Sequence, residues 1–182
     1  MENFKWIEEP SGEEREALRK YKDFAWEPIN QQLRAGDLAS DSERATRLLD
    51  SVILKGRTTR PVTLYRALEA RFIPQEIGEV FCDKGFMSTT VSEKAAIEFY
   101  PAAPAAKLVI ELPAGASMAA FEHDAAGGEE RERLLPRETR LEVTAVEQIH
   151  DLERICREQC TSGKHWLSAS STLIKVWLRL LG

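Results

Sequence analysis

The chain has 182 residues, of which 43% are hydrophobic and 30% charged, with a formal net charge of -5. Its length and composition fit one water-soluble domain, predicted to occupy residues 1–182 with a helical part at about 11–56 and a β-rich part at about 62–180. The negative charge argues against a nucleic-acid partner, because proteins of that class usually carry a basic patch.

The cysteines and histidines give no pattern typical of a disulfide framework or a metal site. Cys156 and Cys160 are four residues apart on a helix predicted over 150–160, but no His or Cys pair lies near them at zinc-site spacing. Residues 1–6 lack the apolar run of a signal peptide, and no stretch approaches the ~20 apolar residues of a membrane span. We therefore expect no metal, no membrane partner and, for an exported protein, a route without a classical signal.

The first third of the chain is predicted to be helical and structural in role. Ser11 and Glu14 are spaced as a capping box at the start of a helix over 11–26. Pro28 is expected to end that helix, and a short second helix over 29–34 should stop near Gly36. A third helix at about 42–55 has apolar residues at helical spacing and ends at Gly56.

After Pro61 the sequence becomes rich in β-branched and aromatic residues, which favour strands. Arg66 lies in the middle of the first predicted strand, over 62–68. A guanidinium is rarely buried without an anion, so Arg66 either reaches the surface, pairs with a structural carboxylate, or binds a phosphate through its bidentate fork. Further strands are predicted at 80–81, 107–112, 117–121, 130–135, 139–146 and 172–180, although the last pattern would also fit an apolar helix.

Two polar groups of residues stand out within this β-rich part. Ser88, Thr89 and Thr90 end an apolar strand, and such hydroxyls either form turns or hold a carboxylate or a ribose hydroxyl in place. Glu130 and Glu132 lie two apart after Gly127-Gly128, so a strand there would put both carboxylates on one face. Because like charges repel, at least one of them should titrate unusually or have a cationic partner.

Taken in order, the strand arginine, the Ser-Thr-Thr strand end and the Glu-x-Glu strand resemble the mono-ADP-ribosyltransferases of the R-S-E class, which include many bacterial toxins and effectors. The helical segment 29–34, Ile-Asn-Gln-Gln-Leu-Arg, is also typical of that family. The resemblance spans roughly residues 15–150. It implies an α+β fold in which helices pack on two small, mostly antiparallel sheets, with NAD in the cleft between them.

The resemblance also implies roles for individual residues. Arg66 is expected to anchor NAD through its phosphates, Ala67 to bond the nicotinamide amide through its backbone, and Ser88 to orient Glu132, the expected catalytic glutamate. Glu130 would engage the acceptor, and the loop over 122–129 would recognise the substrate. The remaining expected NAD contacts are Thr89, Phe99, which would stack on nicotinamide, and Arg71, a second phosphate ligand.

The resemblance thus implies an enzyme that uses NAD as substrate, without a metal, and transfers ADP-ribose to a target protein, with arginine as the expected acceptor. It also implies a bacterial toxin or effector that is secreted or injected and acts in a target-cell cytosol. Alternatives left open are an NAD glycohydrolase, transfer to threonine or to a nucleic acid, and an inactive binding domain. The family resemblance also leaves room for an immunity or activator protein as a partner. The sequence identifies neither the target nor the role of residues 150–171.

Overall fold

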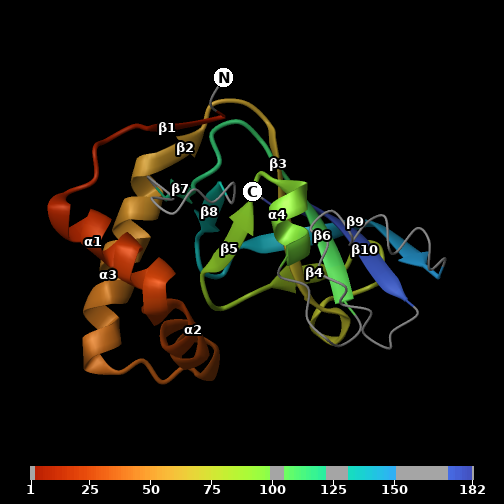
Figure 1. Ribbon diagram of the computed structural model, residues 1–182, viewed down its shortest axis with the longest axis horizontal. Helices are drawn as coiled ribbons and strands as arrows, with labels where there is room; N and C mark the ends of the chain where they lie inside the picture. The colour runs from red at the N-terminus through yellow and green to blue at the C-terminus, as the bar shows by residue number, and fades with distance from the viewer. Residues whose placement is uncertain (1–2, 99–104, 122–130, 151–171, 182) are drawn as a thin grey trace.

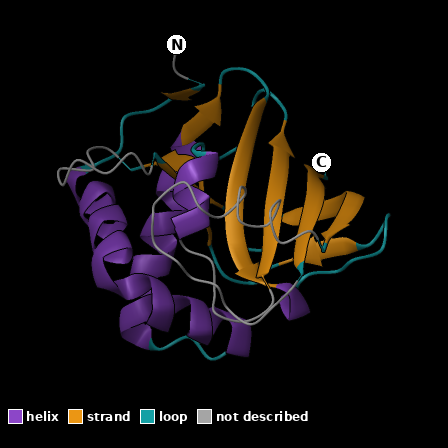
Figure 2. Cartoon of the chain, turned by 45° about the vertical axis from the view of Figure 1, so that its right-hand side comes forward, coloured by secondary structure: helices purple, strands orange, loops and turns teal. Residues whose placement is uncertain are grey.

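The computed structural model describes residues 3–98, 105–121, 131–150 and 172–181. A layer of helices from the first third of the chain lies beside a β-sheet built from the remainder (Figures 1 and 2). The predicted α+β class is therefore confirmed.

The first helical segments run on without the break that was expected at Pro28. Helix α1 (Gly12–Lys20) begins at the predicted capping box, where Ser11 and Glu14 bond each other's backbone N–H. It continues through a π-helix, η1 (Tyr21–Ala25), into α2 (Trp26–Ala35). Pro28 does not end the helix because it lies in the first turn of α2, where proline is tolerated. Helix α3 (Ser40–Lys55) ends at Gly56, as predicted.

The sheets are mostly antiparallel. Strands β1 (Phe4–Trp6) and β2 (Gly56–Thr58), which were not predicted, form a two-stranded sheet. In the described part of the chain, eight further strands pair in the order β4-β9-β10-β6-β3-β5-β8-β7, with only β6 and β10 parallel among them. Their bounds are β3 (Val62–Glu69), β4 (Val80–Cys82), β5 (Met87–Thr90), β6 (Ala105–Leu112), β7 (Ala119–Ala120), β8 (Glu132–Leu135), β9 (Arg140–Ile149) and β10 (Leu173–Leu180).

The larger sheet divides into two parts between β3 and β5. Strand β3 pairs with β6 along its whole length, from Val62 opposite Leu112 to Glu69 opposite Ala105. Its pairing with β5 is a single residue pair, Tyr65 opposite Thr90. The strands therefore separate on either side of this pair, which gives the two-sheet arrangement that was predicted. The short connecting helices η2 (Ala70–Phe72) and α4 (Glu93–Glu98) follow β3 and β5, respectively.

Two large apolar clusters make up most of the core in the described part of the chain. One lies against β3, β6, β9 and β10 and includes Leu64, Leu108 and Val176, all without exposed surface. The other joins the helices to β7, to β8 and to the residue before β5, through buried side chains that include Tyr21, Leu49, Phe86, Ala119 and Leu134. Full burial of one large apolar side chain stabilises the fold by roughly 1.5–3 kcal/mol, so the second cluster fixes the helical layer relative to these strands.

The structure decides two points about the predicted strands: whether residues 172–180 form a strand or a helix, and where the strand predicted at 130–135 begins. Strand β10 lies between β6 and β9, and this central position explains an apolar pattern that would also have fitted a helix. Strand β8 begins at Glu132 rather than at Glu130, because Arg131 has a φ of 43°, in the left-handed region where a strand cannot continue. The helix predicted over 150–160 lies outside the described residues.

Candidate active site

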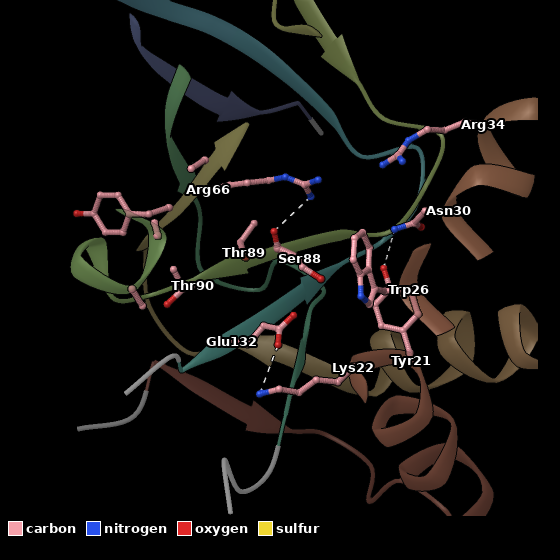
Figure 3. Close-up of a pocket in the computed structure, with 14 residues that line it drawn as sticks. Tyr21, Lys22, Trp26, Asn30, Arg34, Arg66, Ser88, Thr89, Thr90 and Glu132 are labelled. Carbon is pink, nitrogen blue, oxygen red and sulfur yellow. Dashed lines mark hydrogen bonds and ion pairs between the residues drawn. The ribbon is translucent and has the colours of Figure 1, made fainter. Parts of the chain in front are cut away.

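A pocket of about 510 Å³ lies where β3 and β5 separate, with the helical layer forming its other side. The three main signals in the sequence meet there: Arg66 comes from β3, Ser88 from β5 and Glu132 from β8 (Figure 3). The pocket lining consists of Tyr21, Lys22, Trp26, Asn30, Arg34, Tyr65, Arg66, Ala67, Ser88, Thr89, Thr90, Ala95, Ala96 and Glu132.

Arg66 is a partly buried cation whose side chain points toward Ser88 (Figure 3). Its Nη1 donates a hydrogen bond to the carbonyl oxygen of Ser88, at 3.3 Å. Burial lowers the pKa of Arg66, and the charge of Asp83 opposes that shift. A guanidinium still remains protonated at neutral pH, so the pocket contains a poorly solvated positive charge suited to binding an anion.

The three consecutive hydroxyl residues have different partners. The Ser88 side chain forms a hydrogen bond with Tyr21, whose pKa burial raises to about 12. Thr89 donates its hydroxyl to the Arg133 carbonyl at 2.9 Å, and the Thr90 hydroxyl accepts the backbone N–H of Ser92 at 2.9 Å. Thr89 thus lines the pocket, but its hydroxyl is already bonded to the backbone of β8. Its role in NAD binding stays a prediction.

Glu132 is the first residue of β8 and lies opposite Thr90 in the ladder. Its Oε2 is 3.6 Å from the Nζ of Lys22, and the two side chains are 19% and 26% exposed. A cationic partner near the carboxylate pair was expected from the sequence, and Lys22 provides one for Glu132. Glu130, Phe99 and the loop over 122–129 lie outside the described residues.

The helical layer contributes side chains to the pocket. The sequence had predicted only a structural role for this part of the chain. The reason for the contribution is the π-helix: the Trp26 N–H bonds the Tyr21 carbonyl five residues earlier. In an α-helix a five-residue step would leave two side chains about 140° apart, whereas the wider turn brings them toward one face. Tyr21, Lys22, Trp26, Asn30 and Arg34 then all reach the pocket. A signal was available, because Asn30 and Arg34 belong to the segment typical of the family.

Arg34, rather than Arg71, supplies the second guanidinium of the site. Arg71 lies beyond the end of β3 and is 72% exposed, with its Nε 2.7 Å from Glu69, and it does not line the pocket. Arg34 lines the pocket and forms a two-pronged pair with Asp83, at 2.8 and 2.7 Å. This hydrogen bonding raises the pKa of Arg34 and holds its side chain in a fixed orientation.

Within the described residues, no cluster of three or more His, Cys, Asp or Glu side chains is arranged to hold a metal ion. No helix in the same part of the chain is long and apolar enough to cross a membrane.

Comparison with known proteins finds one family whose model matches most of the chain. The model of the ADP-ribosyltransferase exoenzyme family matches residues 1–167. A search of curated proteins finds no match. Among solved structures, Plx2a, an ADP-ribosyltransferase toxin from Paenibacillus larvae, is 19% identical, with a TM-score of 0.71 over 94% of this chain and 87% of that chain.

Two further structures were solved with NAD or an analogue. C3stau2 from S. aureus, with NAD, is 22% identical, with a TM-score of 0.70 over 94% of this chain and 87% of that one. Exoenzyme S from Pseudomonas aeruginosa, bound to Carba-NAD and in complex with human 14-3-3 protein beta, is 18% identical, with a TM-score of 0.68 over 93% and 74%. At these identities the likeness shows a shared fold.

Proposed function

This chain belongs to the ADP-ribosyltransferase exoenzyme family, and we propose that it transfers ADP-ribose from NAD to an arginine of a target protein, as a bacterial toxin or effector. Membership makes it an NAD-dependent mono-ADP-ribosyltransferase. The acceptor and the biological role are the parts that this proposal adds.

The observation that carries the proposal is the meeting of Arg66, Ser88 and Glu132 in one pocket, from three strands that are far apart in sequence. NAD carries a negative pyrophosphate and a positive nicotinamide ring. A pocket that receives it therefore benefits from a cation for one end and a carboxylate for the other. Arg66 and Glu132 provide this polarity, with Ser88 between them in the pocket lining.

The NAD contacts that we propose place the pyrophosphate at the positive side of the pocket and the nicotinamide ribose beside Glu132. Arg66 binds the phosphates, and Arg34, held by Asp83, lies where it can add a second positive charge. Ala67, next to Arg66 on β3, presents its backbone to the nicotinamide amide. Trp26, half exposed and on the pocket lining, offers an aromatic face to a ring of the dinucleotide.

Cleavage of the nicotinamide–ribose bond requires a negatively charged group near the ribose, and it does not require a general acid. The bond between ribose C1′ and the nicotinamide nitrogen breaks, and its electron pair leaves with nicotinamide, which departs neutral. No proton has to be supplied to this leaving group, in contrast to ordinary glycosidases. Glu132 would stabilise the positive charge that develops on the ribose and accept a hydrogen bond from its 2′-hydroxyl. Ser88 would help to orient it.

The acceptor step is assigned to Glu130. A protonated guanidinium is a poor nucleophile, so a carboxylate must orient the incoming arginine and assist removal of its proton as nitrogen bonds C1′. The Glu130-Arg131-Glu132 order supports this assignment from sequence alone. If it is correct, Glu130→Gln loses transfer to arginine but keeps appreciable NAD hydrolysis. Equal loss of both activities would refute this division of roles.

The acceptor itself is tested by incubating the protein with tagged NAD and a host-cell lysate, followed by mass spectrometry of the modified peptide. We expect a labelled protein modified at arginine. Modification at threonine would show that arginine is not the acceptor, but it would still support the proposed transferase activity. Release of free ADP-ribose without a labelled band would favour the alternative of an NAD glycohydrolase.

A further inference from the structure

Lys22 lines the pocket together with three other charged residues, and it is the one that has no role in the proposed reaction. It lies on η1, next to the buried Tyr21, and its Nζ is 3.6 Å from Glu132 and 5.7 Å from the centre of the Phe121 ring. Both distances are within the range of attraction for an ammonium group, to a carboxylate and to an aromatic face. Its side chain is 26% exposed, so water screens this charge less than it does the surface pairs.

The backbone around Lys22 keeps it at this position. Tyr21 is fixed on both sides, because its hydroxyl accepts a hydrogen bond from Asn30 at 2.9 Å and also bonds Ser88. These two hydrogen bonds of Tyr21 also anchor the start of the π-helix to the wall of the pocket. Lys22 therefore enters the pocket from a firmly held turn, opposite the strand that carries Glu132 (Figure 3).

We propose that Lys22 is the resting counter-ion of Glu132 and that the nicotinamide cation of NAD competes with it for this carboxylate. This rests on the proposed function, which puts the nicotinamide ribose beside Glu132. The ammonium of Lys22 and the pyridinium would then be neighbours of one carboxylate and would repel each other. Binding of NAD⁺ must move Lys22 away or tolerate the repulsion, and either one weakens binding.

The competition has a direct consequence for turnover. Nicotinamide leaves without charge, so once the modified protein has also left, the pocket no longer contains a competing cation. Lys22 then pairs again with Glu132, which favours the empty pocket over one that retains NAD⁺. Lys22 thus acts as a positioning residue that sets the affinity for the charged substrate without touching the bond that breaks.

NAD⁺ and NADH together provide the test, because they have nearly the same shape but the dihydronicotinamide of NADH carries no positive charge. Their dissociation constants would be measured by titration calorimetry for the wild type and Lys22→Gln. We expect Lys22→Gln to bind NAD⁺ roughly tenfold more tightly and NADH less than twofold more tightly, from the repulsion between unit charges ~6 Å apart in a partly screened site. Lys22→Arg, which keeps the charge, should preserve the wild-type ratio of the two constants.

Lys20→Gln is the matched control, because Lys20 lies two residues earlier, is 54% exposed and pairs with Glu16 rather than with a pocket residue. It should leave both constants unchanged. An equal change for NAD⁺ and NADH in Lys22→Gln, or a lower kcat with both constants unchanged, would overturn this inference while leaving the proposed function intact. Failure of the wild type to bind either dinucleotide would overturn both.

Discussion

Asn30 bonds both backbone groups of Phe86, 56 residues later in the chain. Its Nδ2 donates to the Phe86 carbonyl at 3.2 Å, and its Oδ1 accepts the Phe86 N–H at 2.9 Å. The same Nδ2 also donates to the Tyr21 hydroxyl. One buried amide thus joins the helical layer to the segment that leads into β5, and Gly85 lets it approach, since a Cβ there would lie 2.7 Å from Oδ1.

Replacing Asn30 by alanine should destabilise the fold by about 2–4 kcal/mol, because buried backbone groups of Phe86 would lose their partner. The free energy of unfolding from urea denaturation would measure this. Gln31→Ala is the matched control: Gln31 is exposed and bonds Glu27 on the same helix, so its removal should cost below about 0.5 kcal/mol. Similar values for the two variants would contradict the assigned role of Asn30.

Arg66→Ala should weaken NAD binding by about 10–100-fold, the loss expected when a charged hydrogen-bond donor to phosphate is removed. Isothermal titration with NAD is the direct measurement. Arg71→Ala removes an exposed guanidinium that pairs with Glu69 outside the pocket, and it should change affinity by less than about twofold. If the two variants were affected equally, the assignment of Arg66 as the anchor would be wrong.

Stability should depend on pH through Glu14, which lies buried between α1 and α3. Burial raises the pKa of Glu14, but hydrogen bonds from Ser51, Ser11 and Lys55 outweigh this and lower it from 4.5 to about 2. The stabilisation is present above pH 4.5, where the carboxylate is charged in both states. It is lost as pH falls toward 2, because the unfolded chain takes up the proton first.

The check is the free energy of unfolding between pH 6 and pH 2, measured for the wild type, Glu14→Gln and Glu13→Gln. Glu14→Gln should be less stable at pH 6 and show a shallower decline toward low pH. Glu13 is exposed and pairs with Arg44 on the surface, so Glu13→Gln should follow the wild-type curve. A Glu14→Gln curve parallel to that of the wild type would show that Glu14 does not contribute as described.

The sequence predicted the parts of the fold that depend on local pattern. Ser11 and Glu14 are three apart and cap one helix, and the alternation around Arg66 is that of a strand in both the prediction and the structure. The convergence of Arg66, Ser88 and Glu132 depends on which strands pair. That pairing is non-local, and it was expected through resemblance to a family rather than through spacing.

The errors arose where backbone geometry departs from regular periods. A π-helix adds one residue to a turn, so a reading at 3.6 residues per turn missed that Tyr21, Lys22 and Trp26 share the pocket with Asn30. The left-handed backbone of Arg131 likewise cannot be predicted from an arginine in a charged segment, and it is the reason that β8 begins at Glu132.

The central claim is that Glu132 promotes cleavage of the nicotinamide–ribose bond. Its most direct test is the rate of nicotinamide release from NAD by the wild type and Glu132→Gln, measured with and without a protein lysate as acceptor. The amide keeps the shape of the side chain but not its charge, so both rates should fall by about 10²–10³-fold. Rates within tenfold of the wild type, at equal NAD occupancy, would contradict the claim.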